Sequence, residues 1–123
     1  MSDERIEVSH RKGVVIIHPL VEEFEGEIAN LVLSTLYEAI ETDDSPSPKV
    51  VMDLSKVVFI DSMSLGTLVK AASDLAKLKG KFMVAGTQEP VRRTLALTRM
   101  DKLFHTFPTV DEAIEELTST PKA

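Results

Sequence analysis

The chain has 123 residues, of which 43% are hydrophobic and none is cysteine, and its formal net charge is −6 at pH 7. This length supports one domain with its own hydrophobic core, while the lack of cysteine excludes disulfides and thiol catalysis. The negative charge argues against a nucleic-acid ligand, because such binding needs many cationic contacts to phosphates. It is typical instead of a soluble protein or of one that has a basic protein partner.

No run in the sequence approaches the roughly 20 apolar residues of a membrane helix, so we expect no direct membrane insertion. Residues 1–5 are charged and acidic, without the basic start and apolar core of a signal peptide. We therefore predict a cytoplasmic protein with a single domain over residues 1–123, whose folded core runs from about residue 5 to about residue 117.

Alternating or β-branched apolar runs predict strands, whereas apolar residues that recur with a period near 3.6 predict helices. The elements predicted in this way are, in chain order, strands at 6–8 and 14–17, a helix at 25–41, a loop at 42–48, a strand at 50–54 that 57–60 extends, a helix at 62–78, a strand at 82–85, a helix from 89, a strand at 104–107 and a helix at 110–117. The tail from Thr118 is expected to fray.

Turn and cap residues mark the boundaries of these elements. Lys12-Gly13 lies between the first two strands and predicts the tight turn of a hairpin. Gly80 is the candidate C-cap of the helix that begins at Ser62, and Pro90 is tolerated in the first turn of the next helix. Because strands and helices alternate after the hairpin, we predict an α/β fold with a mixed sheet of four to five strands and helices packed on it.

Residues 50–68 form the most informative segment, which predicts a buried strand, a short loop and the start of a helix. The helix would begin within the run Asp61-Ser62-Met63-Ser64-Leu65-Gly66, which places two hydroxyls beside a carboxylate. The N–H groups of a helix N-terminus are unpaired and carry partial positive charge, so this position stabilises an anion such as a phosphate. Asp61 is well placed to cap the helix by accepting from a first-turn N–H.

The same run resembles the signature Asp-Ser-(Ser/Thr)-Gly-Leu-Gly of the anti-sigma-factor antagonists, the STAS family of small bacterial partner-switching proteins. Residues 90–98 resemble the third helix of that family, and residues 101–114 resemble its ending more closely. The resemblance implies the family's α/β fold. It also implies a protein that binds an anti-sigma factor of the serine-kinase type through the start of its second helix and so releases a sigma factor.

The signature of the family carries a hydroxyl that becomes phosphorylated, but Met63 occupies the usual acceptor position here. The resemblance leaves two candidate phosphoacceptors, Ser62 and Ser64, with a third possibility that neither is modified. Ser62 lies where some scaffold-type relatives have a phosphoserine. Ser64 takes the family's usual glycine position, where a small residue also allows close packing. Phosphorylation would add negative charge to a surface that must desolvate against the partner, and it would thereby switch binding off.

An α-helix turns by about 100° per residue, so the apolar residues of the predicted helix define which positions face solvent. The inward set is Leu65, Leu68, Val69, Ala72, Leu75 and Ala76. Ser62 and Ser64 then fall on opposite flanks, while Met63, Thr67, Lys70 and Asp74 point away from the core. We expect Met63, with Thr67, Lys70 and Asp74 behind it, to form a partner-docking stripe, since Met adapts well at such surfaces. Asp61, at the start of the helix, is a further candidate for partner binding. The alternative is an isolated exposed methionine without a role.

Three acidic residues outside this helix are further candidates by resemblance. Glu22 and Glu23 precede the first helix, where relatives contact their partners, although a solvated charge run is the alternative. Asp53 ends the buried strand, where family members often have an acidic residue near the phosphoacceptor. A purely structural role, in which Asp53 accepts hydrogen bonds from loop N–H groups, is the alternative there.

The sequence offers no candidate for catalysis or cofactor binding. The three histidines, at positions 10, 18 and 105, lack metal-ligand spacing, and no glycine-rich phosphate loop is present. We therefore expect no metal, no cofactor and no enzymatic activity. A second functional class retains the fold without the switch, as in stand-alone STAS subunits of membrane lipid transporters or in signalling scaffolds. Met63 favours that class, whereas Ser62 beside Asp61 favours the switch.

Overall fold

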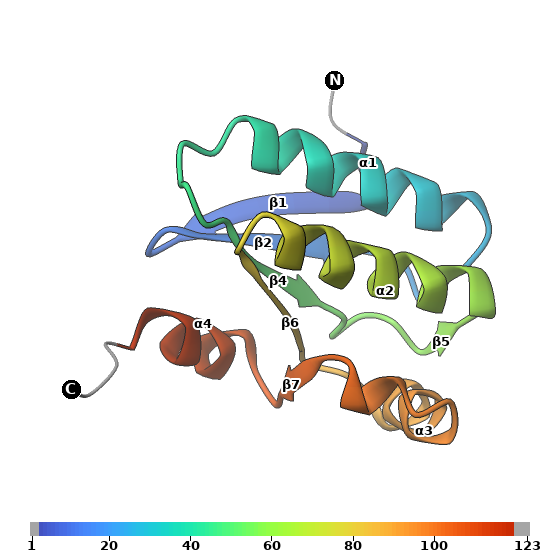
Figure 1. Cartoon of the computed structure of the whole chain (residues 1–123). Coiled ribbons are helices and arrows are strands. Elements are labelled where there is room, and N and C mark those ends of the chain that lie inside the picture. Colours follow the sequence, from blue (N-terminus) through green and yellow to red (C-terminus); the bar gives the residue numbers. More distant parts are fainter. Residues whose placement is uncertain (1–2, 120–123) are drawn as a thin grey trace.

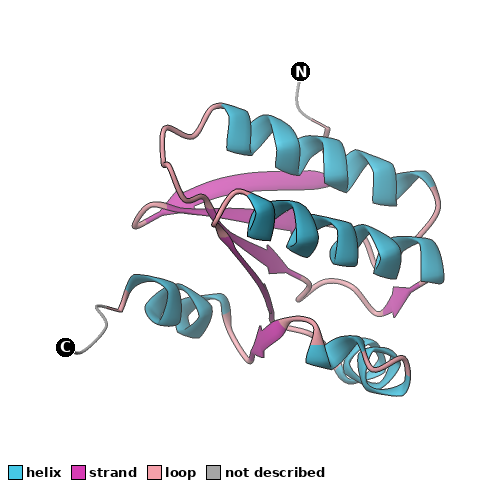
Figure 2. Cartoon of the chain, in the orientation of Figure 1, coloured by secondary structure: helices cyan, strands magenta, loops and turns pink. Residues whose placement is uncertain are grey.

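The computed structural model describes residues 3–119 of the chain (Figures 1 and 2). The elements are, in chain order, β1 (Ile6–Arg11), β2 (Val14–Pro19), β3 (Glu23–Phe24), α1 (Glu27–Glu41), β4 (Lys49–Asp53), β5 (Phe59–Ile60), α2 (Ser62–Lys77), β6 (Lys81–Ala85), α3 (Glu89–Leu97), the 3-10 helix η1 (Met100–Lys102), β7 (His105–Phe107) and α4 (Val110–Thr118). The predicted α/β class is confirmed. Residues 120–123, most of the tail expected to fray, lie outside the described residues.

The main sheet has five strands in the order β1-β2-β4-β6-β7. β1 pairs antiparallel with β2, whereas β2, β4, β6 and β7 are parallel neighbours, so the sheet is mixed as predicted. Lys12 and Gly13 form the hairpin turn, and both have positive φ, at 53° and 78°. Two central residues with positive φ are typical of the type I′ turn, whose twist matches that of the flanking strands.

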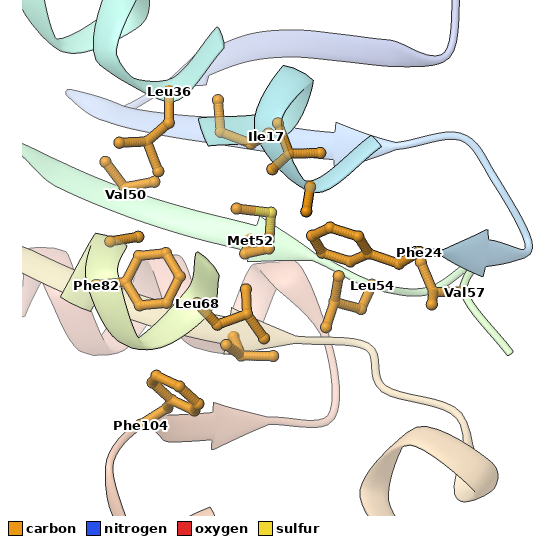
Figure 3. Packing of buried hydrophobic residues seen from close by; sticks show 14 of the residues in the cluster. Ile17, Phe24, Leu36, Val50, Met52, Leu54, Val57, Leu68, Phe82 and Phe104 are labelled. Atoms are coloured by element: carbon orange, nitrogen blue, oxygen red, sulfur yellow. The ribbon is translucent and has the colours of Figure 1, made fainter. Parts of the chain in front are cut away.

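Helices cover both faces of this sheet. α1 and α2 lie side by side on one face, and α4 lies on the other (Figure 1). Side chains alternate between the faces along each strand, so Ile17 packs into the larger cluster below α1 and α2 while Ile16 packs against α4. The larger cluster includes Phe24 of β3, Met52 of β4 and Leu68 of α2, which pack together (Figure 3).

The prediction that residues 57–60 extend the central strand is wrong. β4 ends at Asp53, and Phe59–Ile60 forms the separate strand β5, which pairs in parallel with β3 in a two-stranded sheet. The intervening chain turns because Val57 N–H donates to Leu54 C=O at 3.0 Å. The apolar run thus serves two different sheets.

The predicted cap at Gly80 is also wrong in its geometry. α2 ends in a Schellman motif in which Lys79, with φ of 60°, takes the left-handed position. The Gly80 N–H then donates to Leu75 C=O at 2.7 Å. Gly80 is required for a different reason, because a Cβ there would lie 2.2 Å from the carbonyl oxygen of Pro48.

Candidate functional site: the corner at the start of α2

The start of α2 is attached to the loop that precedes α1. Val58 N–H donates to Glu22 C=O at 2.7 Å, and Asp61 N–H donates to Phe24 C=O at 3.3 Å. These bonds continue the β3–β5 pairing on both sides, so the acidic loop runs directly beside the chain that enters α2. The structure therefore brings the loop of Glu22 and Glu23 beside the chain that enters α2.

Asp61 is the N-cap of α2, as predicted. Its Oδ1 accepts from the Ser64 N–H at 2.8 Å, and its Oδ2 accepts from the Gly26 N–H at 3.2 Å. Gly26 is itself the N-cap residue of α1, which has no side-chain cap of its own. The bond from the Ser64 N–H, with help from the Gly26 N–H, lowers the pKa of the Asp61 carboxyl. One ionised carboxylate thus joins the starts of two helices.

The first turn of α2 presents one serine to solvent and hides the other. Ser62 is exposed, and the Met63 side chain beside it is 49% exposed. Ser64 is 0% exposed, and its hydroxyl has no hydrogen-bond partner within residues 3–119. In this conformation the hydroxyl of Ser62 is accessible from solvent and that of Ser64 is not.

The predicted orientation of α2 is therefore wrong in part. Thr67, expected to face away from the core, is only 8% exposed, and Ser64 is buried rather than on a flank. The buried face consists of Ser64, Leu65, Thr67, Leu68, Ala71 and Leu75. Small and hydroxylated residues at 64, 67 and 71 allow α2 to approach its neighbours closely, so packing turns the helix toward them and leaves Ala76 exposed. Apolar character alone does not identify this face.

Lys70 remains on the exposed face, as predicted, and belongs to a small polar cluster. Its Nζ lies 3.3 Å from Asp74 Oδ2, which also accepts a hydrogen bond from the Tyr37 hydroxyl of α1. The Tyr37 hydroxyl and then Lys70 lower the pKa of Asp74, while partial burial, followed by Asp74, raises the pKa of Tyr37. This cluster fixes α2 against α1 below the exposed first turn.

The corner is acidic. Glu22, Glu23 and Glu25 are all exposed on the loop beside Asp61. Partial desolvation, followed by the charge of Glu23 and then that of Asp61, raises the pKa of Glu25. Mutual repulsion of this kind indicates that the carboxylates lie close together, and a cationic partner surface would relieve it.

Phe59 is a surface residue that the sequence analysis missed. It is 49% exposed on β5, four residues before Met63, so the corner has two large exposed apolar side chains among its carboxylates. The sequence has no signal for this exposure, because the run Val57-Val58-Phe59-Ile60 is apolar throughout and does not alternate with polar residues. As an extension of the buried strand 50–54, the run would place every apolar residue inside, and β5 does not.

Asp53 has structural partners of its own. Its Oδ2 lies 2.7 Å from His18 Nδ1, its Oδ1 accepts from the Ser55 N–H at 3.0 Å, and His18 Nε2 lies 2.8 Å from Ser9 Oγ. This chain of bonds connects β4 to β2 and β1, and within residues 3–119 none of the bonds of Asp53 reaches α2. The loop N–H bond was anticipated as an alternative role, whereas the contact with His18 was not.

Other types of site find little support in the described part of the chain. Residues 3–119 contain no group of three or more His, Asp or Glu side chains that could hold a metal ion. None of the helices described there is both long and apolar enough to cross a membrane. A groove of about 660 Å³ lies between β1 and α1, and no residue of the corner lines it.

Comparisons with known proteins identify similar chains along most of this length. A family model described as the STAS domain matches residues 5–113. The anti-sigma-F factor antagonist RsfB of Mycobacterium tuberculosis is 31% identical over 110 residues, which are 89% of this chain and 85% of RsfB. The TM1081 homologue of Thermotoga neapolitana is 35% identical over 69 residues, so the match spans 56% of this chain and only 61% of that relative.

A solved structure agrees with the architecture described above. The NMR structure of TM1081 from Thermotoga maritima superposes with a TM-score of 0.81 at 28% sequence identity, covering 98% of this chain and 94% of that one. The similarity therefore extends over the sheet and the helices on both of its faces.

Proposed function

This chain belongs to the STAS domain family, and from that premise we propose that it is a cytoplasmic anti-sigma factor antagonist. Its partner would be an anti-sigma factor of the serine-kinase type, and binding would release a sigma factor. The names of relatives such as RsfB support the antagonist role. In this proposal the kinase is the enzyme and the present chain is its binding partner and substrate.

The observation that carries the proposal is the exposed corner at the start of α2. Met63 and Phe59 supply apolar area that a partner can desolvate, and both are 49% exposed. Glu22, Glu23 and Asp61 surround them with negative charge, so the complementary surface on the partner is basic around an apolar centre. Lys70 lies farther along the same exposed face and contributes at the edge of the contact.

Ser62 is the phosphoacceptor in this proposal. Its hydroxyl is exposed in the first turn of α2, where backbone N–H groups and the helix dipole stabilise a phosphate. The free protein therefore tolerates the modification without a change of fold. In the complex the same charge would face a desolvated surface beside other carboxylates, and a penalty of about 3 kcal/mol weakens binding more than 100-fold.

The proposal is tested by measuring the affinity of the cognate anti-sigma factor for three variants by calorimetry in ADP. We expect Met63→Glu and Ser62→Asp each to weaken binding by roughly 100-fold, because each places a charge at the centre of the contact. Ser73→Asp is the matched control, since Ser73 is an exposed serine of the same helix three turns from its start. Equal affinity of the Met63→Glu variant and the unmodified protein would refute the docking surface.

Phosphorylation is tested separately with protein purified from its native host. Mass spectrometry of the peptide 58–70 should locate a phosphate on Ser62 and none on Ser64, because only the first hydroxyl is accessible. Incubation with the kinase and ATP should give the same site. Ser62→Ala should abolish the modification and keep the affinity for the ADP-bound partner.

A second candidate function follows from Met63. Since this residue replaces the usual hydroxyl, the chain could serve as a non-phosphorylated STAS subunit of a membrane lipid transporter or as a signalling scaffold. Affinity capture from native-host lysate in ADP and in ATP distinguishes the two functions. Retention of a serine kinase that ATP releases supports the switch, whereas retention of transporter or scaffold proteins regardless of nucleotide supports assembly.

A further inference from the structure

β1 is an edge strand with an open outer side. It is the first strand of the five-stranded sheet, it is six residues long, and no strand of the described chain pairs with its outer edge. Four of its six residues are exposed, including Val8 at 36%. A long edge of this kind presents unpaired backbone groups and is a template for adding another strand.

The hairpin geometry identifies which residues of β1 offer those groups. Arg11 and Val14 close a two-residue turn, so they form a hydrogen-bonded pair, and such pairs alternate with non-hydrogen-bonded ones along the ladder. Glu7, Ser9 and Arg11 therefore direct their N–H and C=O groups to β2. Val8 and His10 direct theirs outward. The Ile6 N–H, which also points outward, is already bonded to Asp3 C=O at 3.2 Å.

Two features of β1 favour one register for an added antiparallel copy of the same strand: the alternation of its outward-directed backbone groups, and the charges of its side chains. A two-fold axis at Ser9 pairs Val8 with His10 of the second copy, so both outward-facing residues of each strand are hydrogen-bonded. It also places Glu7 directly opposite Arg11 of the second copy, in the non-hydrogen-bonded pairing where Cα atoms are only about 4.5 Å apart. Opposite charges in directly facing positions stabilise a sheet.

The neighbouring registers lack these features. An axis at Val8 would set Arg5 against Arg11 of the second copy and would need the Ile6 N–H that Asp3 already uses. An axis at His10 would pair Val8 with Lys12, which lies in the turn. Ser9 suits the axis because its side chain is small and its hydroxyl is already bonded to His18 at 2.8 Å.

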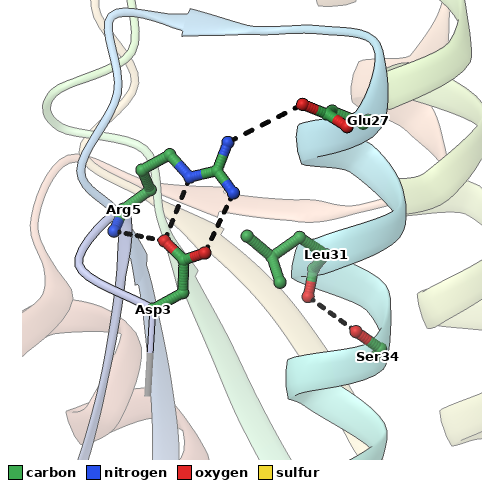
Figure 4. Close-up of polar contacts among 5 residues, drawn as sticks. All are labelled: Asp3, Arg5, Glu27, Leu31 and Ser34. Atoms are coloured by element: carbon green, nitrogen blue, oxygen red, sulfur yellow. Dashed lines mark hydrogen bonds and ion pairs between the residues drawn. The ribbon is translucent and has the colours of Figure 1, made fainter. Parts of the chain in front are cut away.

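The groove between β1 and α1 lies along the same edge. Its volume is about 660 Å³, and its lining includes Val8, His10, Leu20 and Leu31. Asp3 also lines it, held by a bidentate contact with Arg5 at 2.9 and 3.0 Å that lowers the pKa of Asp3 to about 2 (Figure 4). A strand added beside Val8 and His10 would cover the open side of this groove and exclude water from its apolar lining.

We propose that β1 is a self-association surface, through which two copies of this chain form a two-fold dimer with one continuous ten-stranded sheet. The occupant is a second copy because the charges of β1 are complementary to themselves in the register centred on Ser9. The pairing uses no residue of the corner at the start of α2. The dimer would therefore present two docking corners to anti-sigma factors at once.

Sedimentation velocity over a concentration series tests the dimer with charge-reversal variants. Glu7→Arg and Arg11→Glu each turn two attractive pairs into repulsive ones, and we expect each to raise the dissociation constant by about tenfold or more. The double variant Glu7→Arg/Arg11→Glu again places opposite charges at the two facing positions, so it should recover the dimer. An equimolar mixture of the two single variants should form a heterodimer, since the charges of the two strands are then complementary.

Glu116→Arg, an exposed residue of α4, is the control for the change in net charge and should leave association unchanged. Thermal melts check that each variant is folded. This matters for Arg11→Glu, because the substitution also removes the ion pair between Arg11 Nη2 and Asp111 Oδ1 at 2.6 Å. A wild-type protein that stays monomeric up to about 1 mM overturns the proposal. A dimer that all single variants retain also overturns it, because the contact then lies elsewhere.

Discussion

The two faces of α2 share one helix and differ in what a substitution there can change. Its buried face, from Ser64 to Leu75, packs against the sheet and α1, and its exposed face has Ser62, Met63 and Lys70. Ser62 and Met63, on the exposed face, come directly before Ser64, the first residue of the buried face. A charge added to the exposed face is solvated, whereas the same charge on the buried face loses its water. Only the exposed face can therefore serve as a switch that leaves the fold intact.

The largest expected effect separates the two serines of the first turn. Ser64→Asp places an unpaired carboxylate at a site of 0% exposure, so we expect it to lower the free energy of unfolding by about 3–5 kcal/mol. Ser62→Asp, two residues earlier, should change that free energy by less than about 0.5 kcal/mol, because the helix N-terminus favours negative charge. Urea denaturation measures both, and equal losses would contradict the assigned orientation of α2.

Apolar truncations sharpen the same contrast with a smaller effect. Leu68 is 0% exposed in the larger cluster, and Leu68→Ala should cost about 2–5 kcal/mol of unfolding free energy because it leaves a cavity. Met63→Ala on the exposed face should cost less than about 0.5 kcal/mol. The same variant should still weaken partner binding measurably, since it removes apolar area from the docking corner. A Met63→Ala protein as unstable as Leu68→Ala would show that Met63 is packed.

The smallest expected effect is the pH dependence of the Asp61 cap. The pKa of Asp61 is lowered in the folded protein, so the ionised cap contributes stability above the ordinary value of 3.8. That contribution is lost as the pH falls through the lowered, folded-state pKa. Asp61→Asn keeps a capping side chain that does not titrate. We expect thermal melts between pH 5 and pH 2 to show a steeper loss for the unmodified protein than for this variant, and parallel curves would contradict the assignment.

Local features of the sequence were sufficient for much of the fold. The Lys12-Gly13 turn, the Asp61 cap and the helix start near Glu89-Pro90 depend on residues close together in the chain, and each was predicted correctly. Hydrophobic periodicity identified the helices and most strands for the same reason, because it reports which side of an element can be buried. The Asp61-to-Gly66 run also located the corner at the start of α2.

Contacts between distant segments decided the rest. Ser64 and Thr67 are buried because α2 lies close to its neighbours there, and neither residue is apolar enough to indicate this by periodicity. Phe59 is exposed because β5 pairs with β3 and not with the main sheet. In that pairing Phe59 lies opposite Glu23, which is 36 positions earlier in the chain. Gly80 is required by the approach of Pro48, and Asp53 is held by His18.

The sequence by itself therefore determined the helices, most strands of the main sheet, their order and the position of the corner at the start of α2, since these depend on neighbours in the chain. Only the tertiary structure decided that Ser62 rather than Ser64 is accessible, and that β1 is an edge strand of the sheet. The physical reason is that exposure depends on which surfaces other segments cover, and this is settled when the sheet and its helices pack together.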